Sequence, residues 1–179
     1  MKWLTRPEPG EVGRQVLIFA WILMCNLAVQ LLHGALSAVG MPTWPIFLSN
    51  ILYFLMGAPE YKERLIHCVC GGVFGLVCAV GLLWADGALL SLGLSSLWAL
   101  MLPLAVALFL LLALHPVVPW LCNNVAFAFF TISLLDPPAL MAGLGQHILG
   151  VLLGNAIINV GVLLLAVWYG KRQAAKAKR

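Results

Sequence analysis

The stretch LWALMLPLAVALFLLLALHPVVPWLCNNVAFAFFTISLL, residues 97–135, contains no Asp, Glu, Lys or Arg. It is too long for a single membrane crossing, because a helix rising about 1.5 Å per residue needs only about 20 residues to span the hydrocarbon core. Pro116 and Pro119 interrupt the run near its middle, where they break a helix. We therefore divide it into two transmembrane helices joined by a turn.

The composition of the whole chain also points to a membrane. Of the 179 residues, 63% are hydrophobic and 9% are charged, whereas a soluble domain carries about 25% charged residues. So few charges cannot cover a water-soluble surface. The length suits one compact unit, so we expect a single transmembrane domain over residues 1–179.

Six apolar runs are candidates for spanning helices, which predicts an all-α integral membrane protein. The first run is too long for the core of a signal peptide and is expected to be retained. The second is the shortest, and a broken or re-entrant helix is an alternative there. The runs cover roughly residues 15–38, 43–58, 65–85, 96–115, 118–135 and 139–169.

The basic residues fall in three places, each next to an apolar run. They are Lys2, Arg6, Arg14, Lys62, Arg64, Lys171, Arg172, Lys176, Lys178 and Arg179. With six spans and a cytoplasmic N-terminus, all of them lie in the cytoplasm. The loops on the opposite side contain no basic residue and two acidic residues, Asp86 and Asp136. This pattern satisfies the positive-inside rule and predicts two cytoplasmic termini and a basic cytoplasmic tail over residues 171–179. The charge is explained by lipid and gives no reason to expect nucleic acid as a partner.

The two halves of the chain contain similar patterns. Pro45 is followed by the doublet Ser49-Asn50, and Pro119 is followed at the same spacing by Asn123-Asn124. The two doublets differ only in their first residue. Further along, each half has a histidine followed by two glycines: His67, Gly71 and Gly75, then His147, Gly150 and Gly154. We interpret this as a 3+3 repeat, with units of about 14–86 and 96–170. Because each unit has three helices, the repeat is inverted, which favours a solute site near the bilayer midplane.

Polar residues inside the spans are candidates for a solute path, because polar side chains in lipid usually face the protein interior or a wet cavity. Asn50 and Asn124 are expected at mid-depth. The alternative is hydrogen bonding between helices, worth about 0.6–2 kcal/mol per bond. The full candidate set is Ser49, Asn50, His67, Asn123, Asn124, His147, Asn155 and Asn159.

The other two histidines, His33 and His115, are candidates for gating, with simple hydrogen bonding near the headgroups as the alternative. Gly71, Gly75, Gly150 and Gly154 form small-xxx-small patterns and are expected to allow close helix packing, within a subunit or in a homo-oligomer.

The sequence gives little reason to expect an enzyme or a metal protein. In His67-Cys68-Val69-Cys70, neighbouring residues point to different faces of a helix, so we expect no metal site. The predicted spans contain no carboxylate, which argues against a proton-coupled pump. No phosphate-binding loop or HExxH pair is present, and no cofactor is expected.

The stretches from Trp44 to Gly57 and Gly71 to Gly75, and from Pro119 through Phe127 to Gly154, resemble a family of small bacterial inner-membrane proteins. That family is known as a domain of unknown function, number one thousand and ninety-seven, and the resemblance covers residues 40–165. It implies a multi-pass protein of the bacterial inner membrane and no established activity. The histidines depart from the family pattern. The three-plus-three arrangement is also similar, at the level of fold, to that of urea channels.

Two functional hypotheses follow. The first is a passive channel or facilitator for a small polar or weakly basic solute, with its path between the repeats. The alternative is a non-conducting membrane subunit that scaffolds or regulates a partner complex.

Overall fold

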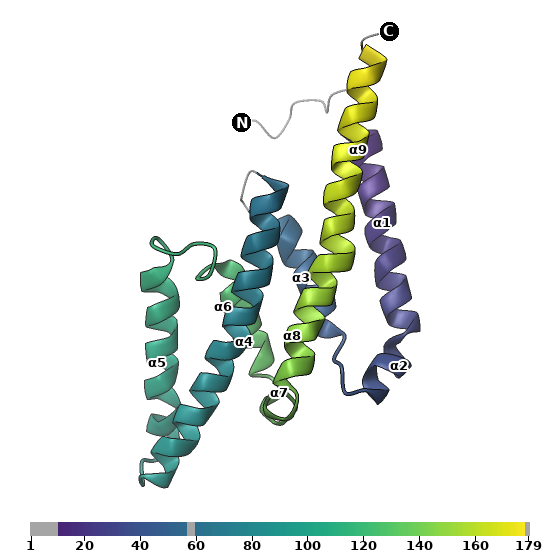
Figure 1. Ribbon diagram of the computed structural model, residues 1–179. Coiled ribbons are helices and arrows are strands. Elements are labelled where there is room, and N and C mark those ends of the chain that lie inside the picture. Colours follow the sequence, from purple (N-terminus) through teal and green to yellow (C-terminus); the bar gives the residue numbers. More distant parts are fainter. Residues whose placement is uncertain (1–10, 57–59, 178–179) are drawn as a thin grey trace.

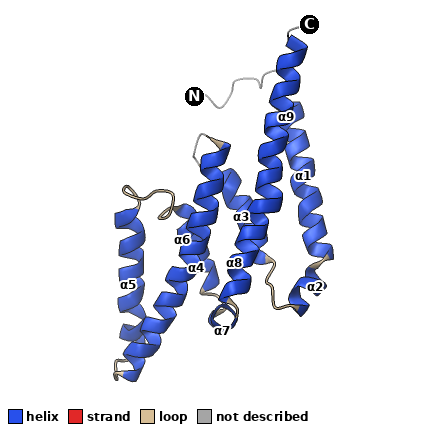
Figure 2. Ribbon diagram, in the orientation of Figure 1, coloured by secondary structure: helices blue, strands red, loops and turns tan. Residues whose placement is uncertain are grey.

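The structure is a computed structural model that describes residues 11–56 and 60–177. Every regular element in these residues is a helix (Figure 2). The elements are α1 (Glu11–Leu31), α2 (His33–Ala38), α3 (Trp44–Leu55), α4 (Tyr61–Ser91), α5 (Ser96–Leu114), α6 (Asn124–Ser133), α7 (Pro137–Ala142), α8 (Leu144–Leu153), the π-helical segment η2 (Gly154–Asn159) and α9 (Val160–Ala177).

The helices differ widely in length. Four segments are long and apolar enough to cross a membrane: Val12–Leu31, Tyr61–Ser91, Ser96–Leu114 and Leu144–Ala175. By contrast, α3 has 12 residues and α6 has 10, about half of what a complete crossing requires. The expected all-helical architecture of a membrane protein is therefore met by four long helices and two short ones.

Successive main helices run in opposite directions, and the chain passes to and fro between two ends of the molecule (Figure 1). The start of α1, the start of α4 and the end of α9 lie at one end, which we call the basic end. These segments carry Arg14, Lys62, Arg64, Lys171 and Arg172. The turn before α7, with Asp136, lies at the opposite end. The basic residues of these segments thus lie at one end of the molecule, as the sequence predicts.

The two halves of the chain are interlocked. In the first half, α3 packs against α8 and η2, and α1 packs against α9. In the second half, α6 and α5 both pack against α4 (Figure 1). The short helix of each half therefore contacts the long final helix of the other half.

Glycines make these two short-helix contacts close. A Cβ atom on Gly75 would collide with the carbonyl oxygen of Ala126 in α6. One on Gly154 would lie 2.8 Å from the carbonyl oxygen of Ile46 in α3. Gly71 and Gly150 lie one turn earlier and face Asn123 and Pro45. The predicted packing glycines thus lie at close helix contacts, against backbone at Gly75 and Gly154 and against side chains at Gly71 and Gly150.

Some predicted boundaries are wrong. The fifth span was expected from residue 118, but α6 begins at Asn124, because residues around Pro119 form turns and Asn123 caps the helix. The third span was expected to end at residue 85, but α4 continues to Ser91 and ends just before Gly93, whose φ of 87° favours glycine. Asp86 therefore lies within α4, not in a loop.

The first and last spans also differ from the prediction. The first is divided into α1 and α2 at Leu32. The last is continuous from α8 through η2 to Ala177, so Lys171 and Arg172 extend a helix and do not begin a separate tail. Several residues that the sequence assigns to the cytoplasmic side lie outside the described residues: Lys2, Arg6, Pro59, Lys178 and Arg179.

Candidate functional site

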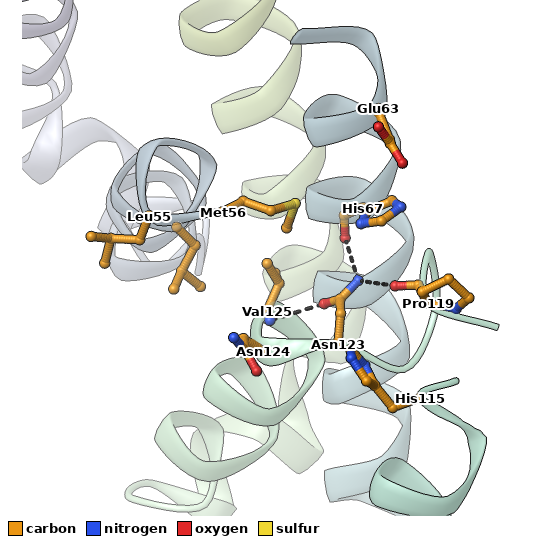
Figure 3. Close-up of a pocket in the computed structure, with 10 residues that line it drawn as sticks. Leu55, Met56, Glu63, His67, His115, Pro119, Asn123, Asn124 and Val125 are labelled. Carbon is orange, nitrogen blue, oxygen red and sulfur yellow. Dashed lines mark hydrogen bonds between the residues drawn. The ribbon is translucent and has the colours of Figure 1, made fainter. Parts of the chain in front are cut away.

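A cavity of about 470 Å³ opens at the N-terminus of α6, near the basic end, and we call it the α6 cavity (Figure 3). Its walls come from α4, from the segment before α6 and from the end of α3. The residues are Leu52, Leu55, Met56, Glu63, His67, His115, Pro119, Asn123, Asn124 and Val125. Four predicted site residues (His67, His115, Asn123 and Asn124) therefore meet in one place.

Asn123 holds this cavity together. Its Oδ1 accepts hydrogen bonds from the backbone N–H groups of Val125 (2.9 Å) and Ala126 (3.1 Å), which caps α6. Its Nδ2 donates to the carbonyl oxygens of Pro119 (3.0 Å) and His67 (3.3 Å) (Figure 3). Both the oxygen and the nitrogen of the side-chain amide are hydrogen-bonded, so Asn123 joins α6 to α4 and is not left free for a solute.

His115 is also fixed by the backbone. Its Nδ1 lies 2.6 Å from the carbonyl oxygen of Cys122, and because a carbonyl only accepts, Nδ1 donates this bond. By contrast, the side chain of Asn124 is exposed at the first position of α6 and lines the cavity. Asn124 is thus available to a solute at this end.

A second cavity, of about 550 Å³, lies at the N-terminus of α3, and we call it the α3 cavity. It is lined by Ser37, Gly40, Met41, Pro42, Trp44, Ile132, Ser133, Leu135, Asp136, Ala139 and His147. The His147 side chain is 5% exposed, and its Nδ1 donates to the carbonyl oxygen of Gly143 over 2.7 Å. Its ring lies 5.6 Å from that of Trp44.

The two cavities have matching positions in the fold. Each lies at the N-terminus of one short helix and the C-terminus of the other. Each also contains a histidine from a long helix, His67 or His147. The remaining histidines follow the same division, since His115 lines the α6 cavity and His33 bonds Thr43, the residue before Trp44, over 3.4 Å.

The segment of α6 between the cavities is tightly packed. Val125 lines one cavity and Ile132 the other, about 10 Å apart along a helix. Phe129 and Phe130, which lie between them, are fully buried, and the Phe129 ring is 5.6 Å from that of Trp44. We call Phe129 and Phe130 the aromatic layer, which lies on α6 between the residues that line the two cavities.

The segment of α3 between the cavities contains two buried polar residues. Ser49 and Asn50 lie between Trp44, at one cavity, and Leu52, at the other, and both are buried. Ser49 contacts a π-helical region with two further buried amides, Asn155 and Asn159. We call Ser49, Asn50, Asn155 and Asn159 the polar cluster.

Hydrogen bonds connect the polar cluster across two elements. Asn159 Nδ2 donates to Asn155 Oδ1 (2.8 Å) and to the backbone carbonyl of Ser49 (3.4 Å). Asn155 Nδ2 donates to the carbonyl of Val151 (2.8 Å). Three buried oxygens have no partner: Ser49 Oγ, Asn50 Oδ1 and Asn159 Oδ1.

The expectation that Asn50 and Asn124 are equivalent is wrong. Thr43 and Asn123 occupy the cap positions of α3 and α6, and the contacts of Gly154 with Ile46 and Gly75 with Ala126 follow at the same offset. In this register Asn50 corresponds to Phe130. Asn50 is buried within its helix, whereas Asn124 begins its helix at a cavity, because α6 starts after Pro119 and not at it.

Four residues that line or separate the cavities have no sequence pattern that predicts such a role: Trp44, Glu63, Asp136 and Phe129. Tryptophan near a span end is typical of the membrane interface, so the sequence contains no signal for a cavity role of Trp44. Only the proximity of helix ends reveals it.

No group of three or more histidine, cysteine or acidic residues within the described ranges is placed to hold a metal ion. The five cysteines are all unpaired. The polar side chains that line the two cavities carry carboxylate, amide, hydroxyl and imidazole groups.

Comparisons of the chain with protein families, with curated proteins and with solved structures found no match.

Proposed function

We propose that this chain spans a bacterial inner membrane six times, as two inverted three-helix units with both termini in the cytoplasm. The units are α1, α3 and α4, and α5, α6 and the continuous helix of α8, η2 and α9. The exchanged packing of the short helices supports this, because an inverted repeat makes each contact twice. Unusually short segments at corresponding places in two halves are typical of such repeats. The basic end then faces the cytoplasm.

On this basis we propose a passive channel or facilitator for a small polar solute. The observation that carries the proposal is the pair of cavities at opposite ends of the short helices, with buried polar residues on α3 between them. Polar side chains are costly in a membrane protein and concentrate along solute pathways. Asn124 and His67 would contact a solute at the cytoplasmic cavity, and His147 at the opposite one.

A flux assay tests this proposal. Purified protein in liposomes is expected to speed the entry of at least one small polar solute over empty vesicles, without an imposed ion gradient. Asn50→Leu, which removes a polar group between the cavities, is expected to lower the flux. Phe127→Leu serves as a matched control, because Phe127 is 47% exposed on α6 and outside both cavities. Flux equal to that of empty vesicles for every solute would overturn the proposal.

The second candidate is a non-conducting subunit that scaffolds or regulates a partner complex. It is favoured by the aromatic layer, which is fully buried between the cavities. It predicts a stoichiometric partner on mild purification from the native membrane and no flux from the isolated protein. Homo-oligomerisation stays a prediction, to be measured by the mass of the detergent-solubilised protein.

A further inference from the structure

The α3 cavity is built by both halves of the chain. The first half contributes the turn between α2 and α3, and the second half contributes the end of α6, the turn before α7 and one residue of α8. These turns lie together at the end of the molecule opposite the basic end (Figure 1). A volume of about 550 Å³ falls within the range of about 300–1,000 Å³ that is typical of small-molecule sites.

The charge around this cavity has one sign. Asp136 is exposed and is the one carboxylate among the described residues that line the cavity. Residues 15–61 and 65–170, which include every residue of the cavity wall, contain no lysine or arginine. A concave site lined by a single sign of charge attracts ligands of the opposite sign, so the α3 cavity favours cations over anions.

Trp44 adds an aromatic ring to the same wall. The indole is partly buried and lines the cavity at the first position of α3. Its ring centroid lies 5.6 Å from the rings of both Phe129 and His147, so the indole is packed on two sides. Tryptophan attracts a cation more strongly than the other aromatic side chains do, and a ring that is already packed loses little freedom when a ligand binds.

Hydrogen bonds through α7 connect Asp136 to His147. The N–H of Ala139 donates to Asp136 Oδ1 over 3.2 Å, and the N–H of Gly143 donates to the carbonyl of Ala139 over 3.0 Å. The carbonyl of Gly143 in turn accepts from His147 Nδ1 over 2.7 Å. With Nδ1 as the donor, the second nitrogen of a neutral imidazole is an acceptor. The helix cap uses only Oδ1 of the Asp136 carboxylate.

We propose that the α3 cavity binds a small organic cation with a substituted ammonium group, held by the Trp44 ring and the Asp136 carboxylate. This inference rests on the proposed solute path, because it makes the cavity the outer entrance of that path and names the class of solute. The carbon substituents of such a cation suit the apolar part of the wall, which includes Met41, Pro42 and Ile132. A bare metal ion lacks a ligand set, since no group of three metal-binding side chains exists within the described ranges.

Binding can be measured on the purified full chain in detergent through the thermal midpoint. Choline chloride is expected to give a saturable rise. Its uncharged carbon analogue, 3,3-dimethylbutan-1-ol, has nearly the same shape and is expected to give none, because it lacks the positive charge. Sodium chloride at equal ionic strength is the second control. An equal response to choline and to either control would overturn the proposal.

Asp136→Asn is the decisive variant. Asparagine caps helices about as well as aspartate does, so this change removes the charge and is expected to preserve α7. It is expected to weaken choline binding about threefold. Asp86→Asn is the matched control, because it removes one negative charge from α4 outside the α3 cavity. Equal choline affinity of the two variants would contradict the role of Asp136 and the proposal.

Replacement of Trp44 tests the aromatic part of the site. Trp44→Phe keeps a ring and is expected to weaken choline binding less than Trp44→Leu, which is expected to weaken it about tenfold. The affinity comes from the concentration dependence of the midpoint shift, so a lower starting midpoint does not obscure it. Trp98→Leu is the control, because Trp98 is 60% exposed on α5 and outside the α3 cavity. Wild-type affinity in both Trp44 variants would contradict the proposal.

The binding and flux experiments fail independently. Choline binding that Asp136→Asn weakens, together with liposomes that conduct nothing, supports the site and refutes the channel. Solute flux without saturable choline binding refutes the site and leaves the channel standing.

Discussion

The two short helices occupy corresponding places but differ in their interiors. Both begin at a cavity, end at the other cavity and pack against a long helix through a glycine. At the sixth and seventh positions after the cap residue, α3 has Ser49 and Asn50, whereas α6 has Phe129 and Phe130. All four side chains are buried.

This difference distinguishes the structural features that both halves share from the residues that occur in only one half. The glycine contacts and the cavities occur twice, as structural features do in a repeat. The polar residues and the aromatic residues occur once each, so α3 has buried polar side chains and α6 has buried aromatic side chains at corresponding positions. A solute path is therefore expected to be asymmetric although its scaffold is nearly symmetric.

The largest expected effect comes from removing one ring of the aromatic layer. Phe129→Ala deletes a fully buried ring beside Trp44 and is expected to lower the free energy of unfolding by about 3–5 kcal/mol. It is also expected to raise solute leak in liposomes. Denaturant unfolding and flux measure the two effects. Phe127→Ala, on the exposed face of α6, is the control, and an equal loss of stability in both variants would contradict the buried layer.

The next prediction tests whether the two halves make corresponding glycine contacts. Gly75→Ala and Gly154→Ala each place a methyl group against a backbone carbonyl of the opposing short helix. Each is expected to lower the thermal midpoint, with a loss of about 1–3 kcal/mol from overpacking. Gly81→Ala, on the same helix as Gly75 but with open space at its Cβ position, is expected to be neutral or to stabilise by up to about 1 kcal/mol. Equal stability of Gly75→Ala and Gly81→Ala would refute the close contact.

A smaller effect distinguishes the two helix starts. Asn123 caps α6 with its side chain, whereas Thr43 makes no side-chain cap bond in α3. Asn123→Ala is expected to cost about 1 kcal/mol, within a range of about 0.5–2. Thr43→Ala is expected to cost less than about 0.5 kcal/mol. Unfolding in denaturant checks both values, and the reverse order would contradict the described caps.

The sequence predicted the helical class and the segregation of charge well, because apolar length and basic flanks are local properties. The start of α6 was harder to predict from the sequence. Pro119 suggested a helix start, but the cap at Asn123 depends on hydrogen bonds to Val125 and Ala126 that form only in the folded turn. The false pairing of Asn50 with Asn124 follows from that error.

The polar cluster was partly predictable for a related reason. Asn155 and Asn159 are spaced by four residues, which places them on one helix face, and the structure joins them by a hydrogen bond. Their contact with Ser49, across 110 positions of sequence, has no local signal. The same holds for the cavities, whose walls come from helix ends far apart in the chain.

The most direct test of the central claim asks which side of the membrane reaches each cavity. In a background without native cysteines, Asn124→Cys probes the α6 cavity and Ser37→Cys the α3 cavity. An impermeant thiol reagent applied to oriented inner-membrane vesicles and to intact spheroplasts is expected to label Asn124→Cys only from the cytoplasmic side and Ser37→Cys only from the outer side. Labelling of both cysteines from the same side would contradict the inverted arrangement and the path built on it.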